Sequence, residues 1–206
     1  QVHLVVGHTH SFNAPIREMR KLIEQGAIGP VAMINSWNFG SFLYRPRRPE
    51  ELRTELGGGA VFNQAPHHID VARYLAGGLV KSVRATAWVH DDARPTEGSY
   101  SCNLHFESGA VATLIYSGYD FFDTDEFHFG LGELGQPKSI SHASSRAALK
   151  NAGASASRGR ADRPWIDAQG VQPAKGHPHF GVTLVSGPRG DLRQSADGIV
   201  LYGPDG

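Results

Sequence analysis

Residues 57–70 read Gly57-Gly58-Gly59-Ala60-Val61-Phe62-Asn63-Gln64-Ala65-Pro66-His67-His68-Ile69-Asp70, and this stretch decides how the rest of the chain is interpreted. Consecutive glycines allow unusual backbone dihedrals and a close approach to a neighbouring segment. Asn63, His67 and Asp70 follow at intervals of four and three residues, a spacing that places side chains on one face of a helix. A core helix would carry apolar residues there, so the pattern predicts a substrate pocket.

Apolar periodicity and turn residues divide the rest of the chain into helices and strands. One helix is expected from Ala14 to Gln25, with Asn13 as N-cap and Gly26 as its stop, and a second from Pro66 to Leu75. Strands are expected at residues 2–7, 31–39, 80–90, 99–107, 110–117, 127–131, 178–186, 190–194 and 198–202, and a long Pro/Arg-rich loop at 40–55. The succession predicts an α+β fold, a large and mostly antiparallel β-sheet with helices packed on one face.

The chain has 206 residues, a length that suits one domain with a well-buried core. Residues 141–159 are rich in Ala, Ser, Gly and Arg and poor in apolar side chains, so they gain little free energy by ordering. We therefore expect a mobile surface insertion at residues 141–174 within a single domain that covers residues 1–206.

Composition excludes several classes of partner. Twenty basic and twenty acidic residues cancel, so nothing indicates nucleic acid or an anionic membrane as a partner. The chain contains one cysteine, Cys102, which excludes an internal disulfide and predicts a cytoplasmic location. Its apolar runs stay far below the roughly 20 residues that a membrane span needs.

The glycine-rich stretch and its flanks resemble the C-terminal domain of the glucose-fructose oxidoreductase / inositol dehydrogenase / MocA family. Members typically show a Gly-Gly-Gly run, then an acid, a His four residues later and a closing Ile-Asp-like pair, which here correspond to Asn63, His67 and Ile69-Asp70. Val5-Val6-Gly7-His8 and the helix and turn from Ile16 to Gly29 are also similar to family segments. The likeness covers most of the chain except roughly residues 140–176.

Within the family, three segments are most similar to dehydrogenases of phthalate cis-dihydrodiols, enzymes of aromatic degradation. These segments are Phe42-Leu43-Tyr44-Arg45-Pro46-Arg47-Arg48-Pro49, Phe62-Asn63-Gln64-Ala65-Pro66-His67 and Tyr119-Asp120-Phe121-Phe122-Asp123-Thr124-Asp125-Glu126. The resemblance implies a cyclic cis-diol substrate of the phthalate type. Carboxylates on such a substrate would explain the arginines of the first segment. Bidentate guanidinium groups of Arg45, Arg47 and Arg48 match carboxylates well, and the Tyr44 ring could stack on a cyclic substrate; a solvated loop is the alternative.

The resemblance also implies what the chain does not contain. Family enzymes bind NAD or NADP on an N-terminal Rossmann domain through a Gly-rich turn and carry a catalytic Lys there, and neither feature occurs in this sequence. We therefore interpret the chain as a substrate-binding and oligomerisation domain separated from its dinucleotide-binding partner. It is expected to hold no cofactor, to be inactive alone, and to form a homodimer or tetramer through its sheet.

His67 is the predicted catalytic residue. A histidine with a pKa near neutrality can accept the hydroxyl proton as hydride leaves an alcohol, and family members share this task between a Lys and this His. Asn63 cannot accept a proton or balance an imidazolium, but its amide could position the substrate hydroxyl; alternatively it only caps the helix. Asp70 could orient the His67 ring or bind elsewhere as a structural group.

Other functions stay open at this point. A sugar or inositol dehydrogenase keeps the family but changes the substrate, and a non-catalytic sensor or assembly module is favoured by Asn63 at the acid position. The pairs His8-Thr9-His10 and His177-Pro178-His179 alternate as metal ligands on a strand can, yet zinc sites need three or four ligands. No metal is expected.

Overall fold

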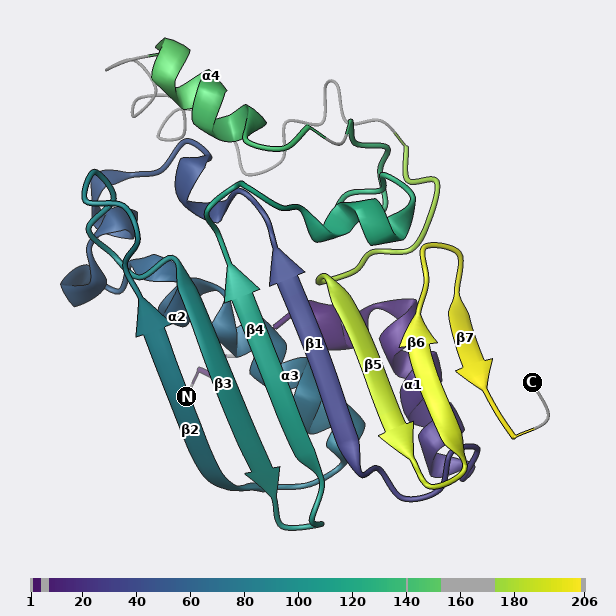
Figure 1. Ribbon diagram of the computed structural model, residues 1–206. Helices are drawn as coiled ribbons and strands as arrows, with labels where there is room; N and C mark the ends of the chain where they lie inside the picture. The colour runs from purple at the N-terminus through teal and green to yellow at the C-terminus, as the bar shows by residue number, and fades with distance from the viewer. Residues whose placement is uncertain (1, 5–7, 140, 153–172, 205–206) are drawn as a thin grey trace.

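The computed structural model describes residues 2–4, 8–139, 141–152 and 173–204. Its centre is a seven-stranded sheet in the order β2-β3-β4-β1-β5-β6-β7 (Figure 1). The strands are β1 (Met33–Phe39), β2 (Val80–Trp88), β3 (Ser99–Phe106), β4 (Val111–Ser117), β5 (Val182–Gly187), β6 (Gly190–Gln194) and β7 (Ile199–Tyr202). The predicted α+β fold is confirmed.

Two meanders flank the central strand β1. The strands β2, β3 and β4 pair antiparallel, as do β5, β6 and β7, whereas β1 is antiparallel to β5 but parallel to β4. A parallel pair requires a long crossover, and residues 40–79 provide it between β1 and β2. The predicted continuous antiparallel meander is therefore interrupted at this one pair among the described strands.

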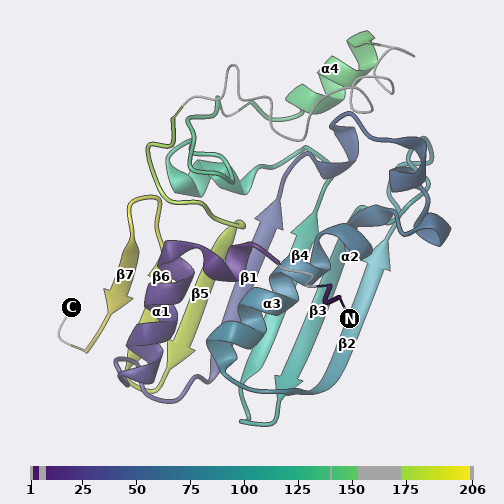
Figure 2. The ribbon, with the colours of Figure 1, turned by 180° about the vertical axis from the view of Figure 1, so that it is seen from behind.

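The longer helices cover one face of the sheet, as Figure 2 shows from behind. Helix α1 (Ala14–Glu24) contacts β6 and β7, and α3 (Ala65–Ala76) contacts β4 and β1. Their inward side chains, such as Met19 and Leu75, are fully buried against sheet residues such as Ile34 and Leu114. A short helix, α2 (Gly59–Asn63), precedes α3.

Loops at one end of the sheet, and the segment before α1, form short 3₁₀ segments rather than further strands. They are η1 (His10–Phe12), η2 (Phe42–Tyr44), η3 (Pro49–Leu52), η4 (Thr54–Leu56) and η5 (Thr124–His128). The predicted strand at residues 127–131 is wrong, because the Asp123 carboxylate accepts a hydrogen bond from the Asp125 N–H and starts η5, and Phe129 then turns the chain with a φ of 56°.

Two other predicted segments fall partly outside the described residues. Residues 2–4 form no strand, and residues 5–7 of the same predicted strand lie outside the described part. In the predicted insertion, Ser144–Ala152 form helix α4, while residues 153–172 are not described. Arg146 fixes the start of α4 because its guanidinium donates to the Tyr119 carbonyl at 3.0 Å and lies 4.1 Å from the centre of the Tyr44 ring.

None of the helices in the described residues is long and apolar enough to cross a membrane.

Candidate active site

His67 lies in the first turn of α3, on the helix-covered side of the sheet. Pro66 occupies the start of this helix, where its missing N–H costs nothing. The half-buried imidazole of His67 contacts the rings of His10 and Phe180, with centroid distances of 4.9 and 5.4 Å. Its Nδ1 atom is buried without a hydrogen-bond partner among the described residues. Because Nδ1 is sealed from solvent, proton exchange with a substrate falls to Nε2 of this half-buried ring.

The glycine run adopts the unusual backbone that its sequence predicts. Gly57 and Gly59 have φ values of 79° and 81°, and a Cβ on Gly58 would lie 2.6 Å from the Glu51 carbonyl oxygen. This confirms both expected uses of glycine: positive φ and close backbone approach.

The N-terminus of α2 behind these glycines is filled by a carboxylate of the same chain. The Glu97 side chain accepts hydrogen bonds from the Val61 N–H at 3.2 Å and from the Thr54 hydroxyl, and Glu97 is 8% exposed. A Cβ on Gly59 would lie 2.2 Å from Glu97 Oε1, so the two segments are in direct contact. Because Glu97 uses the amides that would bind a phosphate, this helix start does not fit a dinucleotide.

Asn63 belongs to α2 and not to the helix that carries His67. The chain breaks at Gln64, whose φ of −116° separates α2 from α3, so one continuous helical face with Asn63, His67 and Asp70 does not form. The Asn63 amide nitrogen donates to the carbonyls of Gly59 at 2.8 Å and Gly57 at 3.3 Å. These contacts favour the structural interpretation of Asn63, since they tie the glycine turn to the end of α2.

Asp70 lies one turn beyond His67 on α3. Its carboxylate raises the pKa of His67 only weakly, as the smallest of the influences on that ring. The structure therefore places Asp70 near His67 in sequence and space without making it the main partner of the imidazole.

His10, noted in the sequence only as a possible metal ligand, and Glu133, which the sequence patterns do not select, complete the surroundings of His67. His10, in η1, is 5% exposed, and its Nε2 lies 3.0 Å from Glu133 Oε1. The Asn13 amide lies 3.2 Å from His10 Nδ1 and can donate to it, which leaves the ring proton on Nε2, facing Glu133. The alternation of His8 and His10 marks that segment, but Glu133 lies in an irregular loop and carries no sequence signal.

Burial and neighbouring charges set the protonation of this group. Burial lowers the pKa of His67, the neighbouring His10 and His8 rings lower it further, and the Glu133 carboxylate raises it. For Glu133, burial raises the pKa, but the hydrogen bond from His10 and the charge of Arg45 outweigh it and bring the pKa below its usual range. Near neutral pH the site therefore holds a neutral His67, which is a base, beside a carboxylate anion.

The three arginines predicted to bind a substrate carboxylate lie in different surroundings. Arg45 is exposed, donates to the Ser41 hydroxyl at 3.2 Å, and acts on Glu133 through its charge. Arg47 is 7% exposed and donates to the Phe42 carbonyl at 2.8 Å, while Arg48 pairs with Glu50 at 3.3 Å. Only Arg45 is thus placed beside the His67 group.

Tyr44 is buried, and its hydroxyl donates to the Asp91 carboxylate. Burial and this hydrogen bond raise the pKa of the Tyr44 phenol well above its usual range. Its ring packs beneath Arg146. The structure therefore gives Tyr44 structural partners in place of an open face for a substrate ring.

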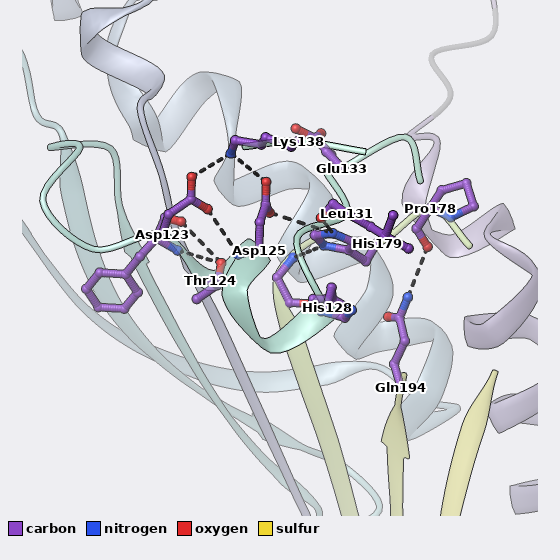
Figure 3. A network of polar contacts seen from close by, with 12 residues as sticks. Asp123, Thr124, Asp125, His128, Leu131, Glu133, Lys138, Pro178, His179 and Gln194 are labelled. Carbon is purple, nitrogen blue, oxygen red and sulfur yellow. Dashed lines mark hydrogen bonds and ion pairs between the residues drawn. The ribbon is translucent and has the colours of Figure 1, made fainter. Parts of the chain in front are cut away.

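The loop that carries Glu133 is fastened by a second polar network (Figure 3). Lys138 bridges Asp123 and Asp125, and the stacked rings of His128 and His179 lie 3.7 Å apart. His179 donates through Nε2 to the Leu131 carbonyl at 3.0 Å, and its backbone N–H donates to the Glu133 carbonyl at 3.0 Å. Among the described residues, no three His, Cys, Asp or Glu side chains are placed to hold a metal ion.

Comparison with known sequences assigns the domain to a family. The sequence model described as GFO/IDH/MocA C-terminal domain matches residues 16–129. The chain belongs to this family.

Individual relatives agree with this assignment. A protein of Comamonas testosteroni named 1-carboxy-3-chloro-3,4-dihydroxycyclohexa-1,5-diene dehydrogenase is 41% identical over 214 residues, which cover 97% of this chain and 52% of the relative. A solved structure of a candidate dehydrogenase from Bordetella bronchiseptica has a TM-score of 0.92 and 42% identity, over 100% of this chain and 54% of the other. The chain thus spans about half the length of these relatives.

A more distant structure has the same fold. The WlbA dehydrogenase of Bordetella pertussis, solved with NADH and UDP-GlcNAcA, gives a TM-score of 0.57 at 19% identity, over 98% of this chain and 47% of the other.

Proposed function

We propose that this domain supplies the substrate site and the proton acceptor of an NAD(P)-dependent dehydrogenase that oxidises a carboxylated cyclic cis-diol. The observation that carries the proposal is the half-buried His67 imidazole, whose pKa is lowered by burial and which meets His10 edge-on beside the Glu133 carboxylate. The 41% identical relative, whose name describes a carboxylated dihydroxycyclohexadiene as substrate, supports this substrate class.

The proposed reaction divides between the two halves of the full-length protein. The carbinol carbon loses a hydride, with both electrons of its C–H bond, and the hydroxyl proton passes to a ring nitrogen of His67, which leaves a ketone. A nicotinamide dinucleotide would accept the hydride, and we assign its binding to the half of the relatives that this chain does not span. The glycine-preceded helix start of this domain is occupied by Glu97. His67 would share the proton with a Lys of that other half, as the family resemblance implies.

Arg45 is the residue that we assign to the substrate carboxylate. Arg45 is exposed and acts on Glu133 through its charge, whereas Arg47 and Arg48 are engaged with other groups. A charge-assisted, bidentate pair would orient the ring so that one hydroxyl faces His67. Asn63 contributes indirectly by holding the glycine turn, and the negative charge of Asp70 acts only weakly on His67.

The test is a substrate screen of the full-length protein with NAD and with NADP. Carboxylated cyclic cis-dihydrodiols should be oxidised far faster than inositols or sugars, as followed by formation of the reduced nicotinamide. Preferred oxidation of an inositol or sugar would overturn the substrate class. An intact dinucleotide site without any oxidation would favour a sensor or assembly module.

We also propose that the uncovered face of the sheet forms a homodimer or tetramer interface. Figure 1 shows this face without helices over it, and Trp37 on the central strand is 45% exposed beside its strand neighbours Ile115 and Val182. Trp37→Arg should lower the oligomeric state of the full-length protein in sedimentation experiments. An unchanged mass would argue against this interface.

Since the single cysteine offers no internal disulfide, we propose a cytoplasmic location for the protein.

A further inference from the structure

The arrangement around His67 raises a question of charge balance. When the imidazole accepts a proton it becomes a cation in a half-buried place, and such a charge is costly without a counter-charge. In the family pattern an acid stands four residues before the histidine. Here that position is Asn63, whose amide carries no charge and is bonded to Gly57 and Gly59.

Glu133 occupies a suitable place in space, although it lies 66 positions away along the chain from His67. His10 stands between the two: its ring meets the His67 ring edge-on at 4.9 Å and its Nε2 meets Glu133 Oε1 at 3.0 Å. The side chain of Glu133 is 38% exposed.

The main chain around Glu133 is held by more than one contact. The His179 N–H binds the Glu133 carbonyl, the His179 ring binds the neighbouring Leu131 carbonyl, and Gly132 accepts and donates hydrogen bonds within the same turn. Figure 3 shows how this turn lies against the His128–His179 stack and the Lys138 bridge. A carboxylate on such a fixed turn keeps its position when the charge of its neighbour changes.

Several charged or titratable groups surround the His67 ring. His8 and His10 lie in η1 and the segment before it, and Asp70 and His68 lie on α3. Arg45, in the loop after β1, acts on Glu133. Glu133 and Asp70 are the anions that stabilise a proton on His67, and the effect of Glu133 is the larger.

We infer that Glu133, held through His10, is the positioning residue that balances the charge of His67 in the proton-accepting step and replaces the acid missing at position 63. This inference rests on the proposed function, because it assigns a partner to the same proton acceptor. The His10 ring lies between the Glu133 carboxylate and the His67 imidazole and prevents them from pairing directly. The His67 Nε2 atom is thereby left to the substrate.

The test compares Glu133→Gln with the parent in the full-length enzyme, through the pH profile of kcat/KM for a carboxylated cyclic cis-dihydrodiol. Loss of the anion should move the acidic limb to lower pH by about 0.5–1 unit and lower kcat about 10-fold, because the imidazolium is less stabilised. Glu133→Asp should restore part of both effects. Glu126→Gln, a matched change in the same region at a side chain that is 39% exposed, should leave the profile where it is.

A second measurement separates this inference from the proposed function. Histidine-selective NMR of the same full-length variants follows the titration of His67 directly, with His67→Gln to assign its signal, and needs no substrate. The His67 signal should titrate at lower pH in Glu133→Gln than in the parent. Coincident titration curves would overturn the inference even if the dihydrodiol is oxidised; a shifted curve without dihydrodiol oxidation would sustain the pairing and reject only the substrate class.

Discussion

Two pairs of imidazole rings lie near the same end of the sheet, and they differ in what surrounds them. His128 and His179 are each 1% exposed and stack face to face, and each ring donates to a backbone carbonyl. His67 and His10 meet edge-on, and His67 is half-buried. A carboxylate accompanies each pair: Asp125 lies 3.6 Å from His179, and Glu133 lies 3.0 Å from His10.

The difference shows that adjacent histidines and a carboxylate do not by themselves make a reactive site. In the stacked pair both rings are sealed from solvent and tied to the main chain, and proton uptake by His128 would cost stability. In the edge-on pair one ring has access to solvent and a nearby anion that can balance its charge. The stacked pair therefore fastens the loop, whereas the edge-on pair is placed to exchange a proton.

The largest expected effect comes from removing the ring of His67. His67→Ala in the full-length enzyme should lower kcat by roughly 10²–10⁴-fold, the usual contribution of an acid–base group. Steady-state kinetics with the dihydrodiol measures it. His105→Ala, at an exposed histidine on β3, is the matched control and should retain parental turnover. Equal kinetics for His67→Ala and His105→Ala would show that the edge-on pair is no more reactive than an exposed surface histidine.

The stacked pair should control stability in acid. Burial, with the nearby His179, lowers the pKa of His128 from 6.5 to about 4, so the unfolded chain binds more protons than the folded one between these values. Stability is then highest above about pH 6.5 and falls as the pH drops toward 4, by about 3 kcal/mol from this ring. Urea unfolding of the full-length protein at several pH values measures this slope.

A substitution assigns the slope to the ring. His128→Gln, whose amide can still donate to the Gly181 carbonyl, should flatten the decline without changing turnover at neutral pH. His142→Gln, at an exposed histidine that pairs with Glu126, should leave the decline as it is. Part of the decline should persist in His128→Gln, because burial also lowers the pKa of His68 to about 3. An unaltered slope in His128→Gln would contradict the structural role of the stack.

The arginines sharpen the comparison at the level of substrate binding. Arg45→Met should raise KM for a carboxylated substrate about 10-fold, since one charge-assisted contact is lost, and should affect an uncarboxylated diol much less. Arg48→Met is the control, because Arg48 is exposed on the same loop but pairs with Glu50. A similar rise in KM in both variants, or for both substrates, would exclude a specific carboxylate contact at Arg45.

The smallest expected effect concerns Asn63. Asn63→Ala removes two hydrogen bonds to the glycine turn and should lower the free energy of unfolding by about 1–2 kcal/mol. The loss in kcat should stay below about 10-fold if Asn63 acts only through the turn. A loss in kcat as large as that of His67→Ala would instead indicate that Asn63 positions the substrate hydroxyl.

Local sequence signals gave the positions of the regular elements well. The helix at Ala14–Glu24 and the strand at Gly190–Gln194 agree with their predicted ranges to within a residue, because their apolar periods and their glycine turns act locally. The segment 127–131 was misassigned because its aromatic residues resemble a strand, while the cap at Asp123 and the positive φ of Phe129 decide for η5.

The site was only half visible to sequence reasoning. His67 could be selected because the glycine run and its spacing are contiguous. Glu133 could not, since it joins the group only through the fold of an irregular loop, and the three arginines, neighbours in sequence, separate as Arg47 turns inward to the Phe42 carbonyl.

The amino-acid sequence alone determined the α+β class, the backbone freedom of the glycine turn and the position of His67 at a helix start, because each depends on neighbours within a few residues. Tertiary structure decided that β1 lies parallel to β4, that Glu97 fills the start of α2, and that Glu133 reaches His67 through His10. Those outcomes depend on contacts between segments tens of residues apart, which only the packed fold brings within hydrogen-bonding distance.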